Sequence, residues 1–195
     1  MTIVFQQHDV PAAIRSLSSL PRVDYVDLFT VVTDGAAGGS PEQWARAGLE
    51  EAAGVAGQFV WRVLCGLRLE PQPSPDHVAG WKIADRGDGW IRLEAASWFM
   101  TARIVVQVDA GQVSVATFIR YDQPVAALVW PALSIGHRQA MPGLLRNTVK
   151  AMAHGRPHSA SRSPDDRCTR ADTPARITAS GAHTSTRERA RVTPV

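Results

Sequence analysis

The most strongly patterned segment of the sequence is His137-Arg138-Gln139-Ala140-Met141-Pro142-Gly143-Leu144-Leu145-Arg146-Asn147-Thr148-Val149-Lys150-Ala151-Met152. One set of positions recurs every three or four residues: His137, Ala140, Met141, Leu144, Leu145, Thr148, Val149 and Met152. This spacing predicts a long amphipathic helix, and Pro142 either kinks it or opens its second part. An apolar helix face needs another layer of structure to cover it.

The residues before this helix predict the layer that covers it. Segments 98–108 and 112–121 are joined by the turn Asp109-Ala110-Gly111, and segments 78–84 and 90–94 precede them. In the last segment, Val113, Val115, Thr117 and Ile119 alternate with Ser114, Ala116, Phe118 and Arg120. Alternation joined by tight turns predicts an antiparallel sheet.

Further upstream, residues 25–32 are β-branched and aromatic and predict a first strand. Ser40, Pro41 and Gln43 form a helix start with a capping box, so we expect a helix to about Ala53. After a break at 54–57, an apolar stripe predicts a second helix over 58–67. The expected fold is α+β: a curved antiparallel sheet wrapped around the long C-terminal helix, with a cavity between them.

Four pieces of the chain carry a resemblance to a known family: Asp24-Tyr25-Val26-Asp27-Leu28-Phe29, Pro41-Glu42-Gln43-Trp44-Ala45-Arg46, Gly80-Trp81-Lys82-Ile83, and Ile135-Gly136-His137-Arg138-Gln139-Ala140-Met141-Pro142. Over roughly residues 20–153 the chain resembles the DUF2867 family of uncharacterised bacterial proteins. The resemblance implies the helix-grip fold of the START-like (SRPBCC) superfamily, with an internal cavity. It implies no reaction, because that superfamily includes carriers, cyclases, hydroxylase subunits and binding proteins.

Charge and composition divide the chain into three parts. We expect an N-terminal extension over 1–20, a START-like domain over 21–154, and a disordered basic tail over 155–195. Residues 1–154 hold 13 Lys and Arg against 14 Asp and Glu, whereas the tail holds 8 Arg against 4 acids. A nearly neutral domain gives no basis for specific nucleic-acid binding.

The remaining composition limits the compartment and the cofactors. No signal peptide and no membrane-spanning run is present, so we expect a cytoplasmic protein. Cys65 and Cys168 form neither a metal-binding pattern nor a redox motif, and Cys65 is best interpreted as a small core residue. We expect no metal and no cofactor.

Four residues are candidates for the lining of a ligand cavity: Trp81, Trp98, Arg120 and His137. The indoles could supply apolar walls, Arg120 could anchor an acidic head group, and His137 could orient a ligand at the cavity mouth. Each also has a purely structural interpretation. The tryptophans and His137 would then be packed core residues, and Arg120 a surface arginine paired with an acid.

His137 and Glu94 are the weak candidates for catalysis, as acid or base. Glu94 alternates with Arg92, which equally fits an ion pair on the solvent side. The nucleophile-elbow, zinc-protease and phosphate-loop motifs are missing. Three hypotheses therefore stand: a binding module for a small apolar or amphipathic molecule, a cyclase- or hydrolase-type enzyme using the same cavity, and a protein-interaction module using a sheet edge or the tail.

Overall fold

The computed structural model describes residues 2–34 and 36–154. Its strands form one antiparallel sheet in the order β1-β2-β7-β6-β5-β4-β3. The strands are β1 (Ile3–Gln7), β2 (Tyr25–Val32), β3 (His77–Val78), β4 (Trp81–Gly87), β5 (Trp90–Ala96), β6 (Met100–Asp109) and β7 (Gln112–Tyr121).

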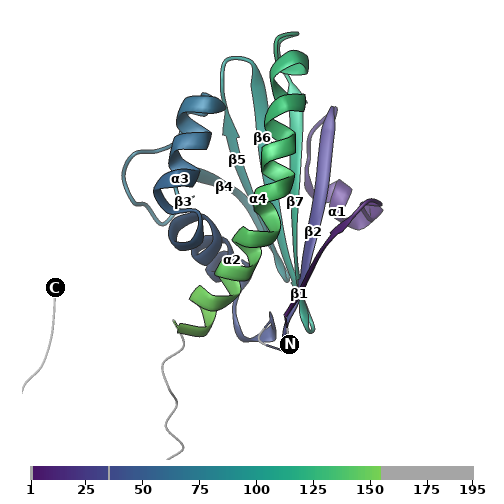
Figure 1. Ribbon diagram of the computed structural model, residues 1–195, viewed down its shortest axis with the longest axis vertical. Coiled ribbons are helices and arrows are strands. Elements are labelled where there is room, and N and C mark those ends of the chain that lie inside the picture. The colour runs from purple at the N-terminus through teal and green to yellow at the C-terminus, as the bar shows by residue number, and fades with distance from the viewer. Residues whose placement is uncertain (1, 35, 155–195) are drawn as a thin grey trace, which may run out of the picture. The chain divides into compact units, whose positions relative to one another are not determined.

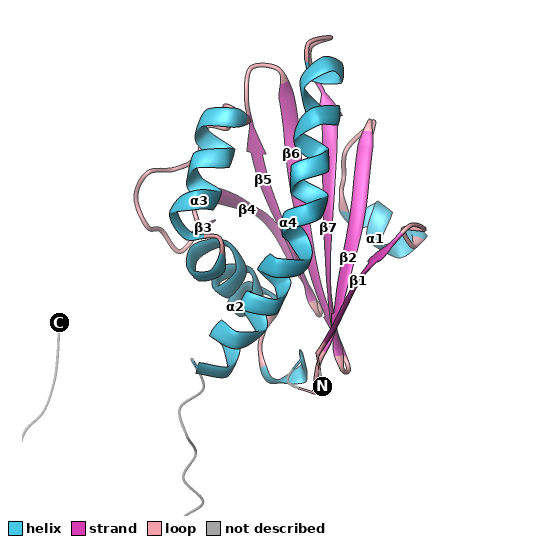
Figure 2. Ribbon diagram, in the orientation of Figure 1, coloured by secondary structure: helices cyan, strands magenta, loops and turns pink. Residues whose placement is uncertain are grey.

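The helical elements are α1 (Ala12–Leu17), the 3-10 turn η1 (Ala36–Gly38), α2 (Pro41–Arg46), the π-helical segment η2 (Ala47–Ala52), α3 (Gly54–Phe59), the π-helical segment η3 (Val60–Leu64) and α4 (Ala126–His154). Helices α2, α3 and α4 lie over the same face of the sheet (Figure 1, Figure 2). The α+β class and the long C-terminal helix are therefore confirmed.

Strands β2 and β7 have the bounds that their sequence patterns predict. They pair over their whole length, from Tyr25 opposite Ile119 to Val32 opposite Gln112. The capping box is also present, since the Gln43 N–H donates to Ser40 Oγ at 3.2 Å and the Ser40 N–H donates to Gln43 Oε1 at 2.8 Å. These elements follow from local signals, namely period-two alternation and a capping motif.

Helix α4 is longer than its sequence pattern predicts, because it begins at Ala126 and not near His137. Pro131 and Pro142 both lie inside it. Residues 126–136 are thus the first part of the same helix, and Pro142 does not divide it into two elements. Thr148 on its buried side lies against Gly48 of η2, where a Cβ atom would lie 3.3 Å from Thr148 Oγ1.

The N-terminal residues differ from the expected extension over 1–20, because they form part of the sheet and of its packing. Strand β1 pairs with β2 along its full length. Val10 and Ile14 are buried against Leu28 and Phe118. We call this side the closed face of the sheet: the face formed by Leu28, Val105, Ala116 and Phe118, covered by the segment that contains α1.

Two arginines from the middle of the sheet hold the end of α1. The guanidinium of Arg103 donates to the carbonyl of Ser18, and that of Arg92 donates to the carbonyl of Leu17 at 2.9 Å. The last carbonyls of a helix lack partners within the helix, so these charged donors satisfy them. The physical reason for the wrong expectation is that residues 1–20 are held by long-range contacts and not by a strong local pattern.

The two helices predicted from Ser40 to about Ala53 and over 58–67 form one almost continuous helical segment. The break is confined to Ala53, and α3 begins at Gly54, whose φ is +50°. In η2 and η3 the backbone bonds span five residues, from the Ala53 N–H to the Gly48 carbonyl and from the Cys65 N–H to the Val60 carbonyl, both at 2.9 Å. Such π-helical turns are wider than α-helical turns and are often found at functional sites.

The predicted disordered tail over 155–195, together with Cys168, lies outside the described residues. Within the described part of the chain, no helix combines the length and the hydropathy that crossing a bilayer requires.

Candidate functional site

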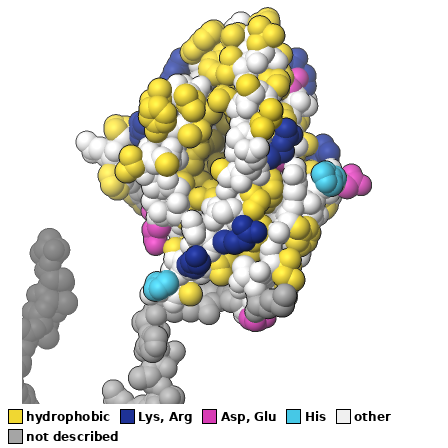
Figure 3. Space-filling model, in the orientation of Figure 1, with side chains coloured by type: hydrophobic (Ala, Val, Ile, Leu, Met, Phe, Trp, Pro, Cys, Tyr) yellow, Lys and Arg dark blue, Asp and Glu magenta, His cyan; other side chains and the backbone are white. Residues whose placement is uncertain are grey.

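A cavity of about 700 Å³ lies between the sheet and the helices α2 to α4. Its floor is the face of the sheet opposite the closed face, which we call the cavity face: Met100, Ala102, Ile104, Val106, Val113, Val115, Thr117 and Ile119. The space-filling view shows the hollow between α3 and α4, bordered by apolar side chains (Figure 3). The volume lies within the range of about 300–1,000 Å³ that is usual for small-molecule pockets.

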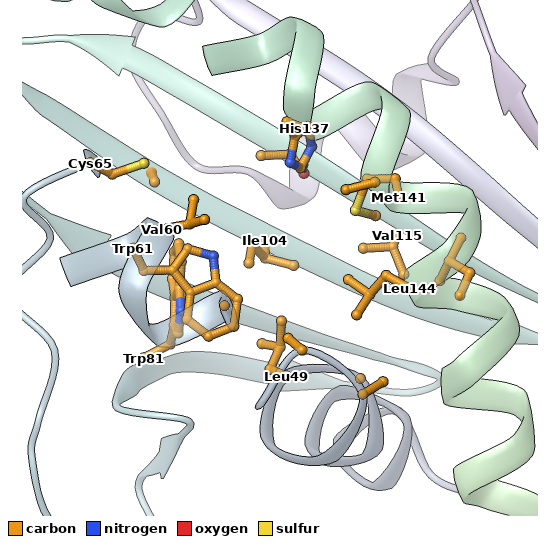
Figure 4. Close-up of a pocket in the computed structure, with 18 of the residues that line it drawn as sticks. Leu49, Val60, Trp61, Cys65, Trp81, Ile104, Val115, His137, Met141 and Leu144 are labelled. Carbon is orange, nitrogen blue, oxygen red and sulfur yellow. Dashed lines mark hydrogen bonds between the residues drawn. The ribbon is translucent and has the colours of Figure 1, made fainter. Parts of the chain in front are cut away.

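The alternation of β7 explains this floor. Val113, Val115, Thr117 and Ile119 line the cavity, whereas Ala116 and Phe118 pack on the closed face, as their alternation predicts. The segments η2, α3 and η3 supply one wall, to which Leu49, Val60 and Trp61 belong (Figure 4). Trp61 packs edge-to-face on Trp81, with ring centroids 5.8 Å apart.

Helix α4 supplies the opposite wall, and much of that wall is made of small residues. Ala132, Gly136, Ala140 and Gly143 all line the cavity. A Cβ atom added at Gly136 or at Gly143 would meet no other atom within 4 Å. All four residues are exposed, so this wall borders the open side of the cavity, and a larger side chain at Gly136 or Gly143 would meet open space.

The mouth of the cavity carries exposed apolar side chains. The predicted stripe over 58–67 does exist, but only Leu67 of its members is buried. Val60 and Leu64 line the cavity while remaining 40% and 45% exposed, and Phe59 and Val63 are 56% and 61% exposed. The stripe thus borders an opening and does not seal the core, because α3 and α4 diverge from one another (Figure 1).

The lining carries almost no polar chemistry. Among the residues that the structure describes, no Lys, Arg, Asp or Glu lines the cavity. The polar groups of the lining are the side chains of Thr117, His137, Asn147 and Thr148, together with the indole N–H groups of its tryptophans. Among the described residues, the N–H groups of Trp81 and Trp130 are buried without a hydrogen-bond partner, whereas the Thr148 hydroxyl donates to the Leu144 carbonyl at 2.9 Å. A site of this kind suits a molecule that is apolar over most of its surface.

His137 is the main polar group in this apolar lining, and β2 holds its ring. Its Nε2 atom lies 3.1 Å from Asp27 Oδ2 and 3.4 Å from Thr117 Oγ1. Asp27 is 3% exposed and lies opposite Thr117 in the pairing of β2 with β7. A buried carboxylate on one ring nitrogen fixes the orientation of an imidazole and the position of its proton.

Tyr25 completes the support of this pair. Its hydroxyl donates to Asp27 Oδ2 at 2.6 Å. Burial, and then the hydrogen bond to Asp27, raise the pKa of Tyr25 well above its ordinary value, so the phenol remains a donor. The guanidinium of Arg138 lies 5.9 Å from the centre of the Tyr25 ring. Tyr25, Asp27 and His137 thus form one connected polar cluster, and of these three residues His137 is the one that lines the cavity.

Two of the four candidate ligand-binding residues lie at the cavity. His137 lines it from α4, and Trp81 lines it from the first residue of β4, buried beneath Trp61. Their structural interpretation also holds in part, because Trp81 is a core residue and His137 is bonded to Asp27.

Trp98 and Arg120 do not line the cavity, which corrects both expectations. Trp98 lies in the turn before β6 and is 63% exposed, because Ser97 Oγ accepts the N–H groups of Phe99 and Met100 and so closes a tight turn there. Arg120 follows the alternation of Phe118 to the other face, where its guanidinium pairs with Asp122 at 2.7 Å.

Glu94 also lies on the side of the sheet away from the cavity, which removes it as an acid or base in this site. It pairs with Lys82 at 3.8 Å and with Arg103 at 3.5 Å, as the ion-pair interpretation predicts. Cys65 does line the cavity, but burial raises the pKa of its thiol to about 11. A thiol that stays protonated near neutral pH is a poor nucleophile.

Asp27 is the site residue that the sequence analysis missed. One signal was present, because Asp27 is the acid inside an otherwise apolar, aromatic strand, on the same side as Tyr25 and Phe29. A carboxylate inside such a strand must have a partner, and besides Tyr25 on the same strand that partner is His137 of α4. The partner could not be named from the sequence, because 110 positions separate the two residues.

Comparisons with known proteins do not assign the chain to a family: no family model, no curated protein and no solved structure matches it.

Proposed function

We propose that this chain has a helix-grip fold of the START-like type and that it binds a small apolar or amphipathic molecule in the cavity. The single observation that carries the proposal is the cavity itself, about 700 Å³ of space with an apolar lining that contains the Asp27–His137 pair. Core side chains usually fill such space, since protein interiors are packed as densely as organic crystals.

The chain order supports the fold part of this proposal. After β1 and α1, strand β2 is followed by the helical segments η1 to η3, then by the antiparallel strands β3 to β7, and finally by α4, while β7 returns to pair with β2. This is the order that the resemblance to DUF2867 implies. Membership of that family remains a prediction.

The test is binding of the fluorescent probe N-phenyl-1-naphthylamine to the full chain, together with native mass spectrometry of the protein as purified. We expect saturable probe fluorescence and a co-purifying molecule that is lost on denaturation. Gly136→Leu should weaken both, because it adds a large side chain to the exposed edge of the cavity lining, where a Cβ atom meets nothing within 4 Å, while its helix gains a better helix former.

The matched control is Gln139→Leu, an exposed position on the same helix that does not line the cavity. It adds the same apolar group but should leave probe binding unchanged. Loss of binding in both variants, or in neither, would contradict a binding site in this cavity.

A second candidate function is a cyclase- or hydrolase-type enzyme, and the contact between Asp27 and His137 supports it. A histidine held by a buried carboxylate can act as an acid or base on a bound molecule. Under this hypothesis His137→Ala abolishes turnover of the co-purifying molecule, or of a 4-nitrophenyl ester, while circular dichroism shows an intact fold. Turnover that survives the substitution would exclude His137 as the catalytic residue.

A further inference from the structure

The few polar groups in the lining of the cavity indicate which class of ligand it can bind. We propose that it selects an uncharged molecule with a hydrogen-bond donor, of the alcohol or phenol class, whose hydroxyl group donates to Nδ1 of His137. This inference rests on the proposed binding function and specifies the ligand class of the same site.

The first argument concerns charge. In the described part of the chain, the lining offers neither a cation for a carboxylate or phosphate nor an anion for an ammonium group. Placing an unpaired ion in apolar surroundings is strongly unfavourable. Asp27, directly behind His137 and 3% exposed, adds a negative charge that repels an acidic head group. The polar end of the ligand is therefore neutral.

The second argument concerns which ring nitrogen carries the proton. Nε2 lies 3.1 Å from Asp27 Oδ2, and a carboxylate can only accept, so Nε2 is the nitrogen that donates. In the neutral imidazole the other nitrogen, Nδ1, then carries a lone pair and accepts. Within residues 2–34 and 36–154, no hydrogen bond to Nδ1 is present. The ligand group that matches it is a donor.

The third argument concerns the other polar lining groups. The hydroxyl of Thr148 is engaged with its own helix, and Asn147 lies exposed at the rim. Thr117 shares the Nε2 side of His137. The indole N–H groups of Trp81 and Trp130 are buried donors without a partner in the described part of the chain, and a hydroxyl group, which accepts as well as donates, is compatible with them. Nδ1 of His137 is therefore the acceptor to which a hydroxyl at the inner end of a ligand would donate.

The experiment is displacement of N-phenyl-1-naphthylamine from the full chain by three matched molecules: dodecan-1-ol, dodecyl methyl ether and dodecanoate. The ether keeps the oxygen but lacks the donor, and dodecanoate carries a charge. One hydrogen bond is worth about 0.5–1.5 kcal/mol, so we expect the alcohol to displace the probe at a concentration about three- to tenfold lower than the ether. Dodecanoate should be the weakest competitor.

Two variants test the role of each residue. His137→Phe should still bind the probe but no longer distinguish the alcohol from the ether. Asp27→Asn tests the positioning residue: the amide can donate to Nε2, so the ring proton moves to Nδ1 and the preference for the alcohol is lost. ¹⁵N chemical shifts of the His137 ring report this change of tautomer directly, and a merely structural role of Asp27 would not produce it.

The outcomes separate this inference from the proposed function. If the wild-type chain binds the probe but prefers dodecanoate, or does not distinguish the alcohol from the ether, the ligand class is wrong and the binding site stands. The same holds if His137→Phe keeps the preference. If the probe does not bind at all, the proposed function fails and the ligand class fails with it.

Discussion

The two faces of the sheet use the same strands in opposite ways. On the closed face, Phe118 and Leu28 are fully buried against the segment that contains α1. Arg92 and Arg103 add hydrogen bonds from the sheet to the end of that helix. On the cavity face, the alternate residues of β7 border about 700 Å³ of space. Neighbouring residues of the same strand thus point to opposite faces, one towards a filled layer and the next towards the cavity.

The difference shows that the hollow does not arise from a lack of apolar side chains in the strands. Val113, Val115 and Ile119 are as apolar as their neighbours on the closed face. The space remains because α4 meets η2 closely at Gly48 and Thr148, and the helices diverge from there (Figure 1). Helix spacing therefore makes the cavity, while the strands form its floor. Four predictions test this difference between the two faces.

The largest effect on stability is expected from truncation on the closed face. Phe118→Ala removes a fully buried ring from a filled layer and should lower the free energy of unfolding by about 3–5 kcal/mol. Val115→Ala truncates a partly buried residue of the cavity floor and should lower it by only about 1 kcal/mol. Urea unfolding measures both. Similar losses would mean that the cavity face is as tightly packed as the closed face.

The next effect concerns the arginines that hold α1. Arg103→Met keeps most of the apolar stem but removes the charged donor to Ser18, so we expect a loss of about 1–3 kcal/mol and faster amide exchange in α1. The control is Lys82→Met, which breaks an exposed pair with Glu94 and should change stability by less than about 1 kcal/mol. Unchanged exchange in α1 would show that apolar packing alone holds this helix.

A smaller effect is expected from the buried thiol at alkaline pH. Burial raises the pKa of Cys65 from 9.0 to about 11, so between these values the unfolded chain releases a proton that the folded chain keeps. Stability then falls as the pH rises, by at most about 1.4 kcal/mol per pH unit. The raised pKa of Tyr25 acts with the same sign at higher pH.

Cys65→Ala should remove the part of this decline that the thiol causes. The measurement is the free energy of unfolding of both proteins just below pH 9.0 and near pH 11. An identical decline in the variant would mean that the thiol does not contribute to it.

The smallest effect is a gain in stability on the cavity side. Gly143→Ala should stabilise the chain by about 0.5–1 kcal/mol, because alanine favours the helix and the added methyl group meets no atom within 4 Å. Thermal unfolding, combined with retained probe binding, is the measurement. A loss of stability would show that the wall at Gly143 is already closed.

Much of the fold follows from local sequence signals. The alternation in β7, the capping box at Ser40 and the periodicity of α4 each predict the element that forms. The N-terminal residues were interpreted wrongly because β1 and α1 are short, and their stability comes from distant partners such as Phe118 and Arg103. Tertiary contacts of this kind override weak local patterns.

The site was less predictable than the fold. His137 was predicted from its place on the apolar face of the C-terminal helix, and Trp81 was predicted as an aromatic side chain. Both line the cavity. Trp98 was assigned to the wrong surroundings, since the Met100 N–H donates to Ser97 Oγ at the start of β6, which leaves Trp98 in the turn before that strand. Whether the cavity stays open depends on the angle between two helices, which no short stretch of sequence encodes.

The small residues along α4 have an evolutionary consequence. A single base change converts a glycine or alanine codon into a valine codon, so each of Ala132, Gly136, Ala140 and Gly143 lies one mutation away from a bulkier wall. None of these changes alters a strand or the Asp27–His137 pair. Mutations at these positions can therefore change the length of the ligand that fits by a few carbon atoms, while the group that binds its polar end stays the same.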